Sequence, residues 1–229
     1  MSNRTLLAAL VTVLFPFKLT AQVGHEPSHS PLHDITTTQG FSLFYGRFAG
    51  ARAAAPVGAR PGPFAALRLE SRLSGPIDLY VTFGEAFSSR NQVVRNDTVK
   101  QVLGPVNQTL VAADLAIILN LTGPKRWHAF APYAGLGFGI IQTAHNLTDP
   151  GGFRVGSNFV LAPTVGAKFF LTRSVALRVE ARDYWLRYEW PLAYYQAPDS
   201  TAVLTKDVHT RQVTHNYTLS AGLSYHFTF

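Results

Sequence analysis

Two triplets of alternating charge are the residues whose spacing most clearly implies chemistry. Each has the pattern Arg-Xaa-Glu-Xaa-Arg, and the members are Arg68, Glu70, Arg72, Arg178, Glu180 and Arg182. Residues two apart project from the same face of an extended strand. Each triplet therefore places a carboxylate between two guanidiniums on one side of a strand, which suits ion pairing or the passage of protons or ions.

Histidines offer the second candidate chemistry. His25, His29 and His33 have the spacing of a metal site on a helix, but Pro27 and Pro31 exclude that helix. A nucleophilic enzyme would need a serine activated by a histidine. The candidates near the expected outer side are His145, His209, His215, Ser157, Ser200 and Ser220. No adjacent His-Ser pair lies in an expected strand, so we predict no catalytic residue, no metal site and no cofactor.

The composition indicates one exported domain. The chain has 229 residues, of which 47% are hydrophobic and 14% charged, and it has no cysteine for disulfides or thiolate metal sites. Its net charge of +7 is too modest and dispersed to predict a nucleic-acid partner. Residues 1–21 have the basic start, short apolar stretch and small final residue of a signal peptide. We expect cleavage after Ala21.

From residue 40 onward, apolar and polar side chains alternate with the period of a strand that has two different faces. The last segment is the clearest, because the odd positions from Tyr217 to Phe229 are apolar or aromatic and the even positions are polar or small. Eight such segments are expected, at 40–49, 62–73, 77–88, 107–121, 129–144, 157–171, 175–189 and 214–229.

The connections between these segments are alternately long and short, as in membrane barrels. An even number of strands also returns both chain ends to the same side. We therefore predict an all-β protein, a closed antiparallel eight-stranded transmembrane β-barrel over residues 40–229. Residues 22–39 lack an apolar period and are expected to form a flexible periplasmic tail.

The polar strand faces favour a barrel whose apolar face meets lipid. In a soluble lipocalin-type barrel the apolar face would instead line the interior. The interior of an eight-stranded barrel is just wide enough to be filled by side chains. We predict that a packed lumen ionic network fills it, and the alternative is a path for protons or ions. Its members are Arg68, Glu70, Arg72, Asp78, Asp114, Lys168, Arg178, Glu180 and Arg182.

Other positions refine this prediction. Gly135, Gly137 and Gly139 are expected to make room for the long charged side chains, with Tyr133 filling part of the remainder. Pro163 removes a ladder hydrogen bond, so we expect a bulge or a local weakness there. Aromatic residues near the strand ends predict two interfacial girdles. These are Trp127, Phe227 and Phe229 at one end, and Trp185, Tyr188, Trp190 and Tyr194 at the other.

Three stretches resemble the small outer-membrane β-barrel proteins of the OmpA, OmpX and OmpW type. Pro132 to Gly139 resembles a central strand, Leu177 to Tyr184 resembles the penultimate strand, and Ser220 to Phe227 is similar to the C-terminal assembly signal. The resemblance implies that periplasmic chaperones and the barrel-assembly machinery recognise the terminal aromatics. Those aromatics are Tyr225, Phe227 and Phe229.

We therefore predict a monomeric, non-enzymatic integral outer-membrane barrel with an envelope-structural or surface-interaction role through four external loops. The alternatives are a lipid A-modifying enzyme and a small pore or hydrophobic-solute carrier. The expected partners are outer-membrane lipids, including lipopolysaccharide, whose phosphates basic loop residues would contact. Those residues are Arg52, Arg60, Arg90, Arg95, Lys100, Lys206 and Arg211.

Overall fold

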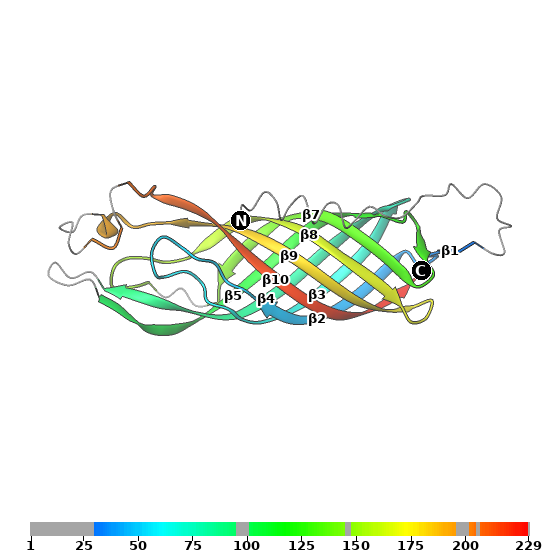
Figure 1. The fold of residues 1–229 in the computed structure, drawn as a ribbon, viewed down its shortest axis with the longest axis horizontal. Coiled ribbons are helices and arrows are strands. Elements are labelled where there is room, and N and C mark those ends of the chain that lie inside the picture. The colour runs from blue at the N-terminus through cyan, green and yellow to red at the C-terminus, as the bar shows by residue number, and fades with distance from the viewer. Residues whose placement is uncertain (1–29, 95–100, 145–147, 196–201, 205–206, 229) are drawn as a thin grey trace, which may run out of the picture. The chain divides into compact units, whose positions relative to one another are not determined.

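The computed structural model describes residues 30–94, 101–144, 148–195, 202–204 and 207–228 (Figure 1). The chain divides into two units, Met1–Pro31 and Leu32–Phe229, and the strands all belong to the second. The expected signal peptide, residues 1–21, lies outside the described residues. Among the described residues, no helix is both long and apolar enough to cross a membrane.

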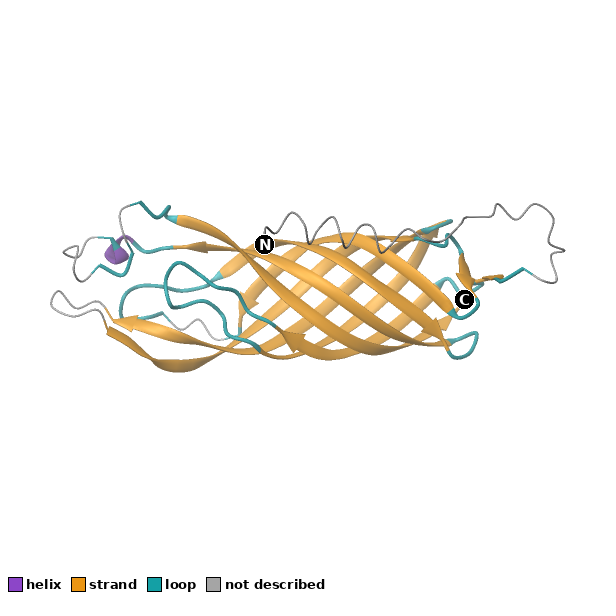
Figure 2. Cartoon of the chain, in the orientation of Figure 1, coloured by secondary structure: helices purple, strands orange, loops and turns teal. Residues whose placement is uncertain are grey.

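Strands dominate the second unit (Figure 2). They are β1 (Leu32–Asp34), β2 (Gln39–Phe48), β3 (Gly62–Ser74), β4 (Ile77–Val94), β5 (Gln101–Asn120), β6 (Lys125–Trp127), β7 (Phe130–Thr143), β8 (Ser157–Phe170), β9 (Val175–Glu189) and β10 (Arg211–Phe227). A short 3-10 helix, η2 (Leu192–Tyr194), follows β9.

Eight of these strands form a closed ring. The hydrogen-bonded order is β7-β5-β4-β3-β2-β10-β9-β8, and pairing between β7 and β8 completes it. Every pairing is antiparallel. The predicted eight-stranded barrel is confirmed, and its closure gives every strand of the ring a partner on both sides. We call the end with the short connections the turn side and the end with the long connections the loop side.

The two faces of the barrel wall are those that the alternation predicts. Val165 and Leu223 point outward and are 58% and 53% exposed, whereas Arg68, Glu180 and Arg182 point inward and are at most 3% exposed. A barrel wall with an apolar outer face and a charged inner face is the reverse of the wall of a soluble barrel. Most of the large apolar side chains that are exposed lie on the outward faces of the strands.

Two features differ from the sequence-based prediction at the strand ends. The β4–β5 hairpin is longer than expected, because Val94 still pairs with Gln101. Residues 32–39, assigned to a flexible tail, have backbone partners instead. Leu32–Asp34 pair with β6, the Ile35 amide donates to the Pro124 carbonyl at 2.9 Å, and Gln39 begins β2. A strand of three residues is too short to produce a recognisable alternation, and residues 22–29 lie outside the described residues.

The long connections form a hydrophobic cap, which we define as the buried cluster on the loop side. Its members from the long connections and the end of β9 are Ala55, Val57, Ala59, Phe153, Val155, Tyr188, Trp190, Tyr194, Val203 and Leu204. The Phe153 ring lies 5.4 Å from the Trp190 ring and 6.3 Å from the Tyr194 ring, both in stacked geometry. Burial, and secondly the Asp149 carboxylate, raise the pKa of the Tyr194 phenol well above its ordinary value. The cap therefore covers its aromatic groups from water.

The cap corrects one predicted girdle. Trp185 points outward as expected, at 38% exposed, but Tyr188, Trp190 and Tyr194 are buried in the cap. The reason at Tyr188 is strand parity: it lies an odd number of residues from Trp185 and so faces inward.

Candidate functional site

The barrel interior holds all nine residues of the predicted lumen ionic network. Eight are buried, and Arg72, with 17% of its side chain exposed, lies toward the turn side of β3. They come from five strands, so residues far apart in sequence meet across the lumen. The members by strand are Arg68, Glu70 and Arg72 (β3), Asp78 (β4), Asp114 (β5), Lys168 (β8), and Arg178, Glu180 and Arg182 (β9).

Glu180 is the centre of the network. Arg68 donates to both of its carboxylate oxygens, at 2.5 and 2.6 Å, and the Tyr133 hydroxyl donates a third hydrogen bond at 2.7 Å. The Nε atom of Arg182 lies 3.4 Å from the same carboxylate. Thr82 accepts from the remaining Arg68 Nε at 3.0 Å. The two terminal nitrogens of Arg68 thus bind one carboxylate in a bidentate pair, the strongest arrangement between an arginine and a carboxylate, and its Nε binds Thr82.

A second centre, toward the turn side, is Glu70. Arg178 and the Ser42 hydroxyl both donate to one of its oxygens, and Lys168 lies 3.3 Å from the other. Lys168 also lies 3.3 Å from Asp78 and so connects the two acids. A lysine can make this connection because its ammonium donates in three directions.

The third centre lies nearer the loop side. Arg182 donates to both oxygens of Asp114 at 2.6 Å, and the Tyr184 hydroxyl lies 3.4 Å from one of them. Because Arg182 also approaches Glu180, it joins this centre to the first. Ion pairs thus connect the first and third centres, whereas the Glu70 centre is linked to them through Tyr133, whose ring lies beside Arg178 and whose hydroxyl donates to Glu180.

Aromatic rings and glycines shape the space around the charges. The Arg178 guanidinium lies 5.1 Å from the centres of the Tyr80 and Tyr133 rings, within cation–π range. The predicted reason for the glycines is right only for Gly137, where an added Cβ would lie 3.2 Å from Asp114 Oδ1. At Gly135 and Gly139 it would instead lie 2.4 and 2.1 Å from backbone carbonyl oxygens of β5. These two glycines allow close approach of neighbouring strands.

This arrangement can hold charge but offers little room to move it. Five bases face four acids, every acid contacts at least one base, and the rings of Tyr80 and Tyr133 pack between them. Buried charges that are paired and hydrogen-bonded are stable, whereas removing one partner costs about 3–5 kcal/mol. The geometry is that of a filled interior.

Sequence reasoning missed several members of the interior. Ser42 and Thr82 share the inward parity of their strands, which was the available signal. The same parity extends to Arg90, which the sequence analysis placed among exposed loop bases. Arg90 instead lies in β4, is 1% exposed and pairs with Asp149 at 2.6 Å. That prediction is wrong because β4 extends beyond its expected end at residue 88, and the Arg90 side chain faces inward.

The other basic residues of the predicted lipid-contacting set divide into two groups. Arg52 and Arg60 are exposed, and Arg211 is exposed and pairs with Glu189 at 2.9 Å. Arg95, Lys100 and Lys206 lie outside the described residues. Of the predicted C-terminal aromatics, Tyr225 and Phe227 lie at the turn-side end of β10 with rings 6.1 Å apart. Phe229 lies outside the described residues.

The histidines and serines weighed as catalytic candidates are not brought together among the described residues. His215 points outward and contacts the Asp183 carboxylate at 2.7 Å and the rings of Trp185 and Tyr217. Ser220 is buried inside the barrel, and Ser157 begins β8. His145 and Ser200 lie outside the described residues. In the part of the chain that the structure describes, no three His, Cys, Asp or Glu residues are placed to hold a metal.

The ring and its charged interior define a class of fold, the closed eight-stranded antiparallel barrel with an apolar outer face. The solved structures that share it are small outer-membrane β-barrel proteins. Neisserial surface protein A has a TM-score of 0.54 at 13% identity, over 82% of this chain and 97% of its own. OprG from Pseudomonas aeruginosa has a TM-score of 0.55 at 11% identity, over 84% and 98%. No protein-family model and no curated protein sequence matches the chain.

Proposed function

We propose that this chain is a non-enzymatic integral outer-membrane β-barrel without an open channel. Its role is envelope-structural or surface interaction, through the four long connections on the loop side. The observation that carries the proposal is the filled interior, in which Arg68, Glu180 and their neighbours occupy the lumen. An interior of this width leaves no continuous water path once such side chains fill it.

Two further observations support the membrane location and the closed state. The outward face is apolar around the ring, with exposed side chains such as Leu43, Phe83, Leu136 and Leu223, as a lipid-facing wall requires. The cap covers the loop side, where the buried Arg90–Asp149 pair ties β4 to the connection between β7 and β8. The loop side would then be the external side.

The test is a conductance measurement on the full chain in planar lipid bilayers, with a general porin as positive control. We expect no single-channel steps, together with recovery in the outer-membrane fraction and a mobility that differs between boiled and unboiled samples. Regular conductance steps would refute the closed interior. Recovery as a soluble periplasmic protein would refute the membrane location.

The proposal includes the route to the membrane. We propose that a signal peptide is removed after Ala21 and that the barrel-assembly machinery recognises Tyr225, Phe227 and Phe229 after transit with periplasmic chaperones. Alanine at Tyr225 and Phe227 is expected to lower the amount of folded barrel in the outer membrane severalfold. Alanine at Tyr45, an outward aromatic on β2 that is also exposed, serves as the control.

A further inference from the structure

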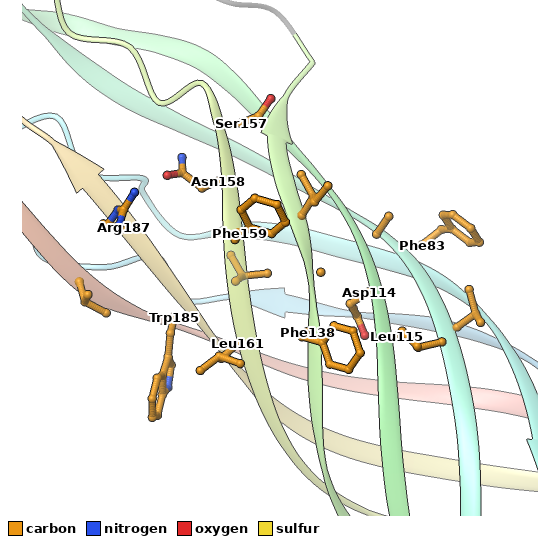
Figure 3. A pocket seen from close by; sticks show the side chains of 16 residues that line it. Phe83, Asp114, Leu115, Phe138, Ser157, Asn158, Phe159, Leu161, Trp185 and Arg187 are labelled. Carbon is orange, nitrogen blue, oxygen red and sulfur yellow. The ribbon is translucent and has the colours of Figure 1, made fainter. Parts of the chain in front are cut away.

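An apolar groove of about 800 Å³ crosses the outer face of the barrel (Figure 3). Its larger walls are Phe83, Leu115, Phe138, Phe159, Leu161 and Trp185. The hollow exists because the residues between these larger side chains, Ala113 and Gly139, are small. Phe159, which is 86% exposed, has one of the least covered aromatic rings on the molecule. The groove is therefore a surface feature of the wall, outside the lumen.

The groove runs obliquely toward the loop side. Phe83 pairs with Ala113, Ala113 with Ile140, and Ile140 with Phe159, so the groove follows one row of paired residues. Phe83 lies six residues from the turn-side start of β4, whereas Arg187, which also lines the groove, lies twelve residues from the start of β9. The tilt and stagger of strands in a barrel produce this climb.

At its upper end the groove meets a polar pocket of about 550 Å³. The two hollows share Ser157, Asn158 and Arg187, so they are continuous. Figure 3 shows Asn158 and Arg187 near each other at one end of the groove and Phe83 at the other. The pocket opens where β8 and β9 separate, because their pairing extends no further than Leu161 and Trp185.

Pro163 accounts for weak pairing just below this point. The Leu171 amide donates to the Val175 carbonyl, so odd-numbered residues of β8 direct their backbone groups toward β9. Position 163 would therefore donate to β9, but proline has no N–H. The ladder is interrupted between Thr164 and Leu161, as the proline predicts. The wall is thus locally loosened next to the hollow.

The polar pocket is positively charged. Arg154 is exposed, and the Arg187 side chain is 55% exposed. The single carboxylate in the pocket, Glu189, lies closer to Arg211, at 2.9 Å, than to Arg187, at 3.6 Å. Guanidinium groups bind phosphate through paired, charge-assisted hydrogen bonds. A phosphate-binding pocket next to an apolar groove fits an anionic lipid, which has a phosphate headgroup and acyl chains.

We propose that the groove and polar pocket form a binding site for lipid A, with an acyl chain along the groove and a phosphate at Arg187 and Arg154. This inference rests on the proposed function, because it assigns the loop side to the external leaflet, whose phosphorylated, acylated lipid is lipid A. The charge complementarity of the pocket selects an anionic lipid over a zwitterionic one. The row of paired residues from Phe83 to Phe159 crosses three strand spacings, about 14 Å, and Arg187 lines the groove on the next strand, so the site is long enough for much of an acyl chain.

The test measures lipid A binding to the full chain, released from detergent micelles, by native mass spectrometry. We expect one lipid A to bind at least tenfold more tightly than phosphatidylcholine or phosphatidylglycerol. Arg154→Gln with Arg187→Gln is expected to weaken binding about tenfold or more, through loss of the phosphate contacts. Ala113→Phe, which fills the groove floor, is expected to weaken it about fivefold.

Matched controls decide between a built site and general attraction. Arg47→Gln removes an exposed outward arginine of β2, and Ala221→Phe adds the same bulk to an exposed position of β10. Both are expected to bind lipid A as the wild type does. Equal weakening by these controls, or equally tight binding of the other two lipids, would overturn the inference. Failure of the wild type to give a heat-modifiable band in vesicles would instead count against the proposed function.

Discussion

Replacing Glu180 with glutamine removes the charge at the centre of the lumen ionic network while keeping nearly the same shape. Arg68 then loses the anion that accepts its two shortest hydrogen bonds, and Arg182 retains only Asp114. Breaking a buried pair by neutralising one partner costs about 3–5 kcal/mol. Because Glu180 faces two guanidiniums, we expect the free energy of unfolding to fall by about 4 kcal/mol.

The measurement is urea unfolding of the barrel in lipid vesicles, followed by loss of the faster band of unboiled samples. Glu189→Gln is the control, because its side chain is on the same strand but 56% exposed, where an ion pair contributes less than about 1 kcal/mol. The double variant Arg68→Met with Glu180→Leu is expected to recover more than half of the loss, since it removes both charges. A Glu180→Gln barrel within about 1 kcal/mol of wild type would refute the assigned role.

Three further changes test other parts of the wall and cap. Asp149→Asn takes the carboxylate from buried Arg90, so loop-side proteolysis of the vesicle-bound barrel is expected to become at least tenfold faster; an unchanged rate would contradict the cap's dependence on this pair. Pro163→Ala restores a donor toward β9, so amide exchange around Leu161 and Thr164 is expected to slow, and equal exchange would count against the loosened ladder. Gly135→Ala is expected to destabilise the barrel by about 1–3 kcal/mol and Gly137→Ala by less than about 1 kcal/mol, because only the former strikes backbone; similar losses in urea unfolding would disprove that distinction.

Alternation made the ring and its faces predictable. Every second side chain of a strand is buried, so the alternation around Tyr217 and Leu223 predicts which residues lie on the same face of the strand. The same rule placed all nine charged residues in the interior. Closure then followed from the even strand number and the alternation of short and long connections.

The pairing inside the lumen was beyond such reasoning. Arg68 and Glu180 are 112 positions apart and meet only because the stagger of the strands brings them to the same level. Alternation gives the face of a residue but leaves open which residues lie opposite across the lumen. For the same reason the bridging position of Lys168, between Glu70 and Asp78, carried no signal in the sequence.

The cap was misread for a different reason. Arg90 and Trp190 lie just beyond the expected strands 77–88 and 175–189, and Tyr188 lies at the end of the second, where charged and aromatic residues are usually exposed. Arg90 is buried because β4 continues past its expected end, and Tyr188 and Trp190 are buried because the long connections fold over them. Only contacts between separate loops, such as Phe153 with Trp190, determine that outcome.

The distribution of charge between the two ends of the sequence bears on how this cylinder is completed. Strands β3 to β5 bring three carboxylates and two cations to the lumen, and strands β8 and β9 bring three cations and one carboxylate. A growing sheet that holds only the early strands must keep its surplus carboxylate hydrated. The cations that balance it arrive with the late strands, so a chain cut before β8 is expected to stay an open, hydrated sheet.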